Sequence, residues 1–126
     1  INKLLYICKK KLNTNGKIII LSLDPKKNKI PAFNLMKNRL KKSLIRDESY
    51  FNLIIKNNPK TIIRNFIFSV RISKTKYLQM IKDRYISTLL NFSDKQISDG
   101  LIEIRNKYKK ELKFKDRLIC LIIKNN

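Results

Sequence analysis

The segment from Leu12 to Asp24 constrains the fold most, because it joins a helical pattern to a short apolar strand through a polar turn at Gly16. Apolar residues recur before it at helical spacing, and Lys9, Lys10 and Lys11 occupy what would be the last turn, where cations suit the helix dipole. Residues 18–21 would be apolar on both faces of a strand, as in a sheet that helices cover on both sides. We therefore expect an αβ unit that enters a buried parallel sheet.

Four later patterns extend this α/β reading. Residues 66–72 alternate with period two, which predicts a strand with one better-buried face. Residues 76–91 have helical spacing and predict a helix. Ser93 and Gln96 have the spacing of a capping box, which predicts the start of another helix. Residues 117–123 are compactly apolar and predict a last strand.

The region between the first two strands predicts a turn and two helices. Asp24 and Pro25 indicate a turn, because proline fixes its own φ and restricts the residue before it. Pro31 precedes a helix with Phe33, Met36, Leu40 and Leu44 on one face. A second helix is expected over about 48–56, ending before Pro59.

The residues that are rare or missing exclude several chemistries. The chain has two glycines and no histidine, so it holds no glycine-rich phosphate loop and no histidine-based catalysis or metal ligation. Two cysteines cannot make a structural zinc site, and we predict no metal. Cys8 and Cys120 lie among apolar residues, which favours two buried free thiols, with a disulfide as the alternative.

The sequence shows neither a secretory signal pattern nor an apolar run near the roughly 18 residues that would span a membrane. We accordingly expect no membrane partner and a reducing, cytoplasmic location.

Thirty Lys and Arg against nine Asp and Glu give a formal charge of +21, which suggests a polyanionic partner. Lys, Asn and Ile have codons rich in A and T, however, and the charge is spread through every segment. We therefore expect no specific nucleic acid partner. The alternative is a small basic nucleic-acid-binding module without catalysis. Against it, Phe66, Phe68, Tyr77 and Tyr108 lie on apolar stripes, where aromatic side chains are core and do not stack on bases.

The order of the segments resembles the carboxyl-terminal half of class I S-adenosylmethionine-dependent methyltransferases. Residues 12–16 resemble the turn before the fifth strand of that family. Four segments resemble the carboxyl end of its type 11 and trans-aconitate groups: 84–89, 92–94, 100–104 and 114–118. The resemblance implies the last part of a Rossmann-like, seven-stranded sheet. The chain would contribute three strands to this sheet, at 17–23, 66–72 and 117–123. The last would be inserted between the other two and antiparallel to them.

The resemblance also implies a function and a domain organisation. Residues 1–126 would form the C-terminal portion of one methyltransferase domain, with a helical insertion at about 30–64 that lids the substrate. The complete enzyme would transfer a methyl group to a small-molecule acceptor. S-adenosylmethionine would be bound by an N-terminal half before Ile1, and this portion alone would be inactive. A third reading is a structural or partner-binding remnant that lacks catalysis.

Arg84 is the first candidate substrate-binding residue, and Tyr77 is the second. On the expected helix Arg84 shares a face with Tyr77, Met80 and Thr88, where a cation beside an apolar wall suits a carboxylate or phosphate. The alternative is that Arg84 lies along the helix surface and pairs with Asp83 or Asp94.

Three further residues are candidates for substrate contact. Tyr85 and Ser87 resemble a recurrent aromatic and serine of the family, although the stripe position of Tyr85 also fits the core. Asp24 stands at the carboxyl end of the first strand, where open α/β sheets collect ligands, but Asp before Pro is also a common turn former. We assign no catalytic residue, because methyl transfer needs little beyond alignment of nucleophile, methyl and sulfonium.

Overall fold

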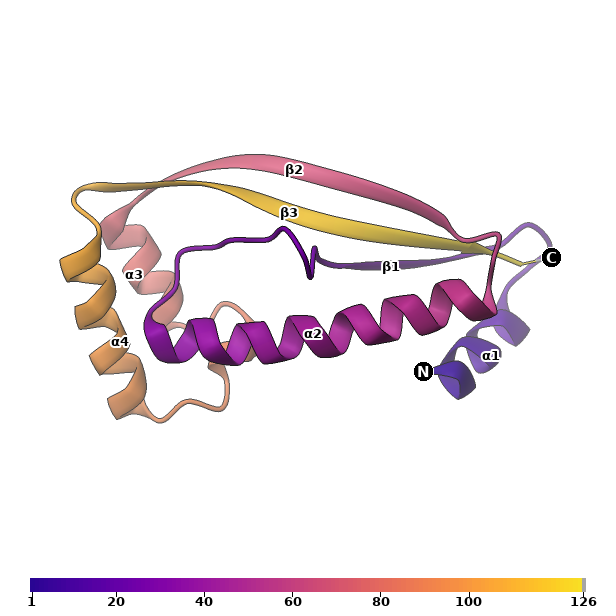
Figure 1. The fold of residues 1–126 in the computed structure, drawn as a ribbon, viewed down its shortest axis with the longest axis horizontal. Helices are drawn as coiled ribbons and strands as arrows, with labels where there is room; N and C mark the ends of the chain where they lie inside the picture. The colour runs from indigo at the N-terminus through magenta and orange to yellow at the C-terminus, as the bar shows by residue number, and fades with distance from the viewer. Residues whose placement is uncertain (126) are drawn as a thin grey trace. The chain divides into compact units, whose positions relative to one another are not determined.

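The computed structural model describes residues 1–125 and has a mixed α/β architecture (Figure 1). In the described chain, the elements follow in the order α1 (Asn2–Lys11), β1 (Lys17–Leu23), α2 (Asn34–Asn57), β2 (Ile62–Ser73), α3 (Lys74–Lys82), a 3₁₀ turn η1 (Ser87–Leu89), α4 (Asp94–Lys107) and β3 (Glu111–Lys124).

The three strands of residues 1–125 form one antiparallel sheet in the order β1-β3-β2. The ladder between β1 and β3 runs from Lys17 opposite Lys124 to Leu23 opposite Leu118. The predicted strand order is therefore confirmed, with the last strand between the other two. The expectation for 66–72 and 117–123 was too short, because β2 begins at Ile62 and β3 at Glu111.

The described chain divides into two compact units. Unit 1 comprises residues 1–28, 44–67 and 117–125, and unit 2 comprises residues 29–43 and 68–116. Three elements, α2, β2 and β3, contribute residues to both units.

Unit 1 has its core on one face of the β1–β3 ladder. Its buried members come from α1, α2 and β3: Leu5, Phe51, Ile54, Leu121 and Ile123. Ile18 and Ile20 of β1 pack against this core, whereas Ile19 and Leu21 are 65% and 58% exposed. The expectation that β1 is covered on both faces is wrong for the described chain, because α1 and α2 supply apolar side chains to one face only.

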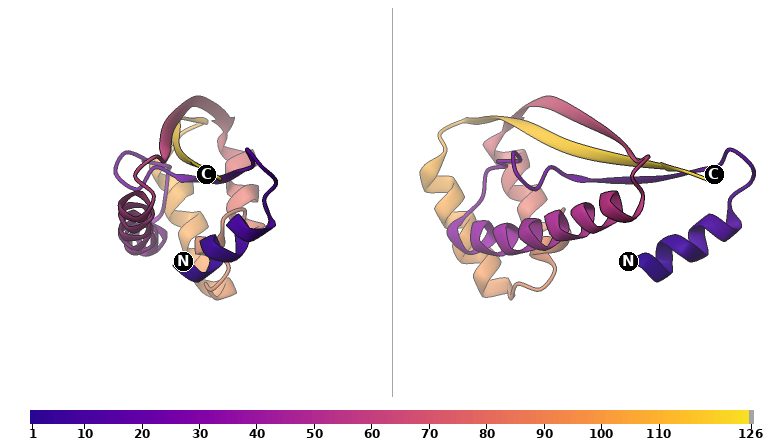
Figure 2. Two further views of the ribbon diagram at one scale, coloured as in Figure 1. Left: turned by 90° about the vertical axis from the view of Figure 1, so that its right-hand side faces the viewer. Right: turned by 45° about the vertical axis from the view of Figure 1, so that its right-hand side comes forward.

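Unit 2 has the larger core. Its most buried side chains come from the residue before α2 and the start of that helix, from α3, α4 and η1, and from the start of β3: Phe33, Met36, Tyr77, Ile81, Leu89, Ile97, Ile104 and Leu112. Helices α3 and α4 pack against each other (Figure 2). Gly100 in α4 faces the ring of Phe33, and a Cβ built there would lie 2.6 Å from the ring Cδ1. The helix therefore needs a glycine here for close packing.

The helical stretch after Pro31 is continuous. We predicted two helices, but α2 runs unbroken over 24 residues from Asn34 to Asn57. Its buried positions, Met36, Leu40, Leu44, Phe51 and Ile54, keep a helical spacing across residues 45–47, which belong to neither predicted helix. Within the range 30–64, where a helical insertion was predicted, residues 34–57 form one long helix and β2 begins at Ile62.

The turn between α1 and β1 uses its residues differently from the expectation. Asn15 adopts the left-handed conformation, with φ of 67°, and Gly16 does not. Asparagine tolerates this conformation because its short side chain bonds locally. A Cβ at Gly16 would lie 2.9 Å from the carbonyl oxygen of Asn13, so the glycine serves a close approach of the backbone.

The aromatic side chains of β2 are not core. Phe66 and Phe68 are 43% and 51% exposed, while Val70 and Ile72 are half-buried. The period-two prediction therefore identified the strand but not its burial: within the predicted range 66–72, only Val70 and Ile72 are partly buried.

Candidate functional site

Tyr77 lies at the centre of the unit 2 core. Ser73 caps α3 by accepting a hydrogen bond from the Lys76 backbone N–H, and the helix so oriented buries Tyr77 to 1% exposure. The Tyr77 hydroxyl donates to the carbonyl oxygen of Pro31 at 2.5 Å. Burial raises the pKa of Tyr77 well above its usual range, so its phenol stays neutral. The Tyr77 side chain is too enclosed to contact a substrate directly. It could influence a substrate only through the residues that it contacts.

Tyr85 is the first of those neighbours. Its hydroxyl oxygen lies 3.1 Å from that of Tyr77, and the two rings meet edge to face with centroids 6.0 Å apart. Burial raises the pKa of Tyr85, and the hydrogen bond with Tyr77 opposes that shift. The charge of Asp116 on β3 also raises the pKa of both tyrosines, so a carboxylate faces this pair. Asp116 was not among our candidates. It is one of several charged residues in a strand, and the sequence does not show which side chains lie next to it.

Arg84 lies just beyond the end of α3, which corrects the expected helix over 76–91. The helix ends at Lys82, and Arg84 is left-handed with φ of 53°. The Arg84 N–H donates to the Ile81 carbonyl and the Tyr85 N–H to the Met80 carbonyl, the bond pattern of a Schellman cap. Glycine usually occupies this position and marks the end of a helix in the sequence. Because arginine stands there, the sequence contains no sign that the helix ends. Arg84 therefore shares no helix face with Tyr77, Met80 and Thr88.

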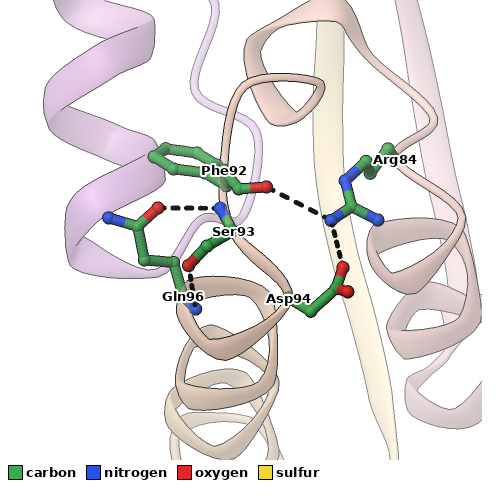
Figure 3. A network of polar contacts seen from close by, with 5 residues as sticks. All are labelled: Arg84, Phe92, Ser93, Asp94 and Gln96. Atoms are coloured by element: carbon green, nitrogen blue, oxygen red, sulfur yellow. Dashed lines mark hydrogen bonds and ion pairs between the residues drawn. The ribbon is translucent and has the colours of Figure 1, made fainter.

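The guanidinium of Arg84 connects the end of α3 to the start of α4. Its Nη2 donates to the Phe92 carbonyl at 3.2 Å and to Asp94 Oδ1 at 2.7 Å (Figure 3). The arginine side chain is 26% exposed and that of Asp94 97%. The pairing with Asp94 is the one named as the alternative to substrate binding, and it leaves the guanidinium partly open to solvent.

The predicted capping box begins α4 directly beside this contact. Ser93 Oγ accepts from the Gln96 N–H at 3.2 Å, and Gln96 Oε1 accepts from the Ser93 N–H at 2.9 Å (Figure 3). This confirmed prediction fixes the backbone on which Asp94 is carried. Ser87, the remaining candidate of unit 2, is exposed at the start of η1.

Asp24 belongs to unit 1 and organises the turn after β1. Its Oδ1 accepts from the backbone N–H groups of Lys26 and Lys27 at 2.9 and 3.0 Å, and the residue is 8% exposed. Asn28 completes the turn by donating from Nδ2 to the Arg117 carbonyl at 2.8 Å. Asp24 therefore forms a turn, which was the alternative interpretation to substrate contact. Asn28 was missed, because one asparagine in a Lys- and Asn-rich turn is inconspicuous.

The candidates do not form one cluster. Tyr77 and Tyr85 contact each other, Arg84 anchors the adjacent turn, and Asp24 is part of the other unit. The cavity bordered by Phe33, Asn34, Glu103 and Lys107 in unit 2 is lined by none of the five. Among residues 1–125 no three Cys, Asp or Glu side chains gather as metal ligands would.

None of the helices in the described chain combines the length and apolarity that crossing a membrane requires.

No model of a protein family matches this sequence, and comparison with curated proteins likewise finds no match.

Proposed function

We propose that this chain is the C-terminal part of an S-adenosylmethionine-dependent methyltransferase that transfers a methyl group to a small-molecule acceptor. The observation that carries the proposal is the sheet, in which β3 lies between β1 and β2 and runs antiparallel. The resemblance of the sequence implies that strand order, and a simple meander of three strands would instead place β2 in the middle. The sheet would be the last part of a Rossmann-like, seven-stranded one.

The uncovered face of β1 gives independent support. Ile19 and Leu21 are exposed, although their strand has the continuous apolar pattern of one buried on both faces. Within residues 1–125, β1 is also an edge strand that pairs with β3 alone. Further strands paired to that edge, with helices over that face, would bury both features.

In the proposed enzyme, the residues of this chain would serve the acceptor side. The partly exposed guanidinium of Arg84 is suited to an anionic group of the acceptor, and Tyr77 would act as a positioning residue through its bond to Tyr85. Asp24 would hold the turn that follows β1. S-adenosylmethionine would supply the methyl group from a site outside this chain.

The decisive experiment begins with the reading frame upstream of the Ile1 codon. We expect it to encode about a hundred or more residues that include a strand, a glycine-rich turn and a helix. Calorimetry should then show that the complete protein binds S-adenosylmethionine and that residues 1–126 alone do not. An in-frame stop directly before Ile1, or a complete protein without cofactor affinity, would contradict the proposal.

Two substitutions at Arg84 test its role in acceptor binding. Arg84→Ala and Arg84→Gly both remove the guanidinium, but glycine suits the left-handed backbone and should be more stable than alanine by about 1 kcal/mol. If the guanidinium binds the acceptor, the acceptor KM of the complete enzyme rises equally in both variants. The increase should correspond to a loss of roughly 1.5 to 3 kcal/mol of binding free energy. A KM that rises in Arg84→Ala only would assign Arg84 to the fold. Lys82→Ala, an exposed change in the same turn, is the control.

A further inference from the structure

The acidic side chains of unit 1 lie at one end of the β1–β3 ladder, beside cations that include Lys26 and Arg46. The acidic side chains of unit 1 are Asp24, Asp47 and Glu48. Glu48 pairs with Lys26 at 3.2 Å, and Asp47 pairs with Arg46 at 3.3 Å. Asp24 follows Leu23, at the opposite end of the β1–β3 ladder from the Lys17–Lys124 pair. At about 3.4 Å per residue, this ladder separates the two ends by roughly 20 Å.

The other end of unit 1 is basic. It is formed by the end of α1, the start of β1, the turn after α2 and the end of β3 (Figure 1). Its lysines are Lys9, Lys10, Lys11, Lys17, Lys56, Lys60 and Lys124. Within the described residues none of these seven forms an ion pair with a carboxylate. We call this end, defined by these lysines, the basic end.

A small cavity of about 140 Å³ opens in the basic end. Lys9, Lys60 and Lys124 line it, together with Ile123 and the other residues of the turn at 57–61. Lys9 Nζ donates to Asn58 Oδ1 at 2.6 Å, which holds the α1 cation against that turn. The turn itself is fixed, because Thr61 donates to the Asn58 carbonyl from both its N–H and its hydroxyl, at 2.9 and 2.7 Å. The cavity is therefore a built recess with cations from three separate elements.

The fold explains only part of this charge. Lys9, Lys10 and Lys11 complete the last turn of α1, and Lys56 the last turn of α2, where cations offset the helix dipole. Lys17, Lys60 and Lys124 lie outside the helices. Lys17 and Lys124 are directly opposite on neighbouring strands, an arrangement of like charges that destabilises a sheet. A bound anion would relieve this repulsion.

We propose that the basic end binds the phosphate backbone of nucleic acid without sequence preference. A single phosphate would neutralise about two of the seven lysines, whereas a nucleic acid strand supplies one charge every few ångströms and releases its counterions on binding. The cavity accepts one phosphate group between Lys9, Lys60 and Lys124. Contacts to phosphate fix position and carry no sequence information. The inference stands on unit 1 alone and does not depend on methyl transfer.

The test is fluorescence anisotropy of the 126-residue chain with labelled single-stranded 20-mers, titrated at several NaCl concentrations between 50 and 300 mM. The triple variant K9Q/K60Q/K124Q should bind at least tenfold more weakly at 50 mM. Its plot of log affinity against log salt should lose about 0.7 in slope, because the three lysines hold one phosphate and each phosphate contact contributes roughly 0.7 on single strands. The variant K60Q/K124Q keeps the Lys9–Asn58 bond and should show about two thirds of that loss.

A matched triple variant in unit 2, K37Q/K41Q/K82Q, changes three exposed lysines and the net charge equally. It should keep the affinity within about twofold and the slope unchanged. Equal losses in the two triple variants would overturn the proposal, because binding would then follow net charge alone. Absence of binding at 50 mM NaCl would also overturn it.

Two further measurements distinguish the sources of phosphate. Inorganic phosphate at constant ionic strength should compete weakly, because it fills the cavity but not the surrounding basic end. Cosedimentation with phosphatidylserine vesicles should be weaker than nucleic acid binding and insensitive to K60Q/K124Q. Vesicle binding that K60Q/K124Q abolishes, without nucleic acid binding, would replace the proposal with a lipid surface.

Discussion

Unit 2 encloses its apolar residues, whereas unit 1 leaves many of its own uncovered. Among the described residues, sixteen large apolar side chains are exposed, of which unit 2 holds four: Leu35, Phe68, Leu90 and Ile102. The other twelve belong to unit 1 and include Ile19 and Leu21 on β1. Soluble monomers rarely expose large contiguous apolar patches. The difference indicates that unit 2 can stand as a closed core and that unit 1 has a surface suited to cover by further chain.

The helices of unit 2 have well-defined starts. Ser73 and Ser93 cap α3 and α4 with their side chains, and each such cap stabilises its helix by about 1 kcal/mol. In unit 1, α1 (Asn2–Lys11) is held by the packing of Leu5 in the core of that unit.

The largest effect should separate the two faces of the unit 1 sheet. Leu121→Ala removes a fully buried side chain and should lower the free energy of unfolding by about 2 to 5 kcal/mol. Leu21→Ala, on the uncovered face, should cost below about 1 kcal/mol. Urea denaturation of both variants measures the difference. Equal costs would mean that the outer face of β1 is covered in solution.

A second substitution tests how tightly unit 2 is closed. Gly100→Ala would place a Cβ against the Phe33 ring, which is itself 2% exposed, and should destabilise by about 1 to 3 kcal/mol. The helix propensity of alanine offsets about 1 kcal/mol of that cost. Ser98→Ala on the exposed side of α4 is the control and should be neutral or slightly stabilising. If Gly100→Ala stabilised the protein, the side chains around Phe33 would have to shift at little cost to accommodate the added methyl group.

The smallest effect concerns an exposed ion pair of unit 2. The hydrogen bond from Arg71 Nε to Glu111 Oε1, with the charge of Arg71, lowers the pKa of Glu111. A lowered folded-state pKa contributes stability above the unfolded value of about 4.3, and that contribution is lost as the pH falls through the folded value. NMR titration should find Glu111 below about 4.3, and Arg71→Gln should return it toward that value. An unchanged pKa in Arg71→Gln would assign the shift to another group.

The sequence predicted those features that depend on local pattern. The strand β1, the capping box at Ser93 and the order of the strands are as expected, the last through the family resemblance. The end of α3 was missed, because the Schellman cap carries Arg84 where the usual signal is glycine. This miss changed the candidate site, since the supposed face of Tyr77 and Arg84 depended on one continuous helix.

Burial and charge distribution were less predictable, because both depend on what packs against a strand. Phe66 and Phe68 alternate as core residues do, yet the described chain leaves them exposed. They therefore give no argument against nucleic acid binding. The lysines of the basic end are spread from position 9 to position 124 and come together only through the sheet register and the turn after α2.

The register of β1 has a consequence for the order in which the chain folds. Its partners on β3 lie 95 to 107 residues further along the sequence. A ladder of such high contact order forms slowly, because the entropy of closing the loop is lost before the pairing gives anything in return. On a ribosome, β1 would emerge well before β3, and the edge of β1 that pairs with β3 would stay open until β3 is made. Chaperones that shield apolar strands would then act chiefly on β1 during this interval.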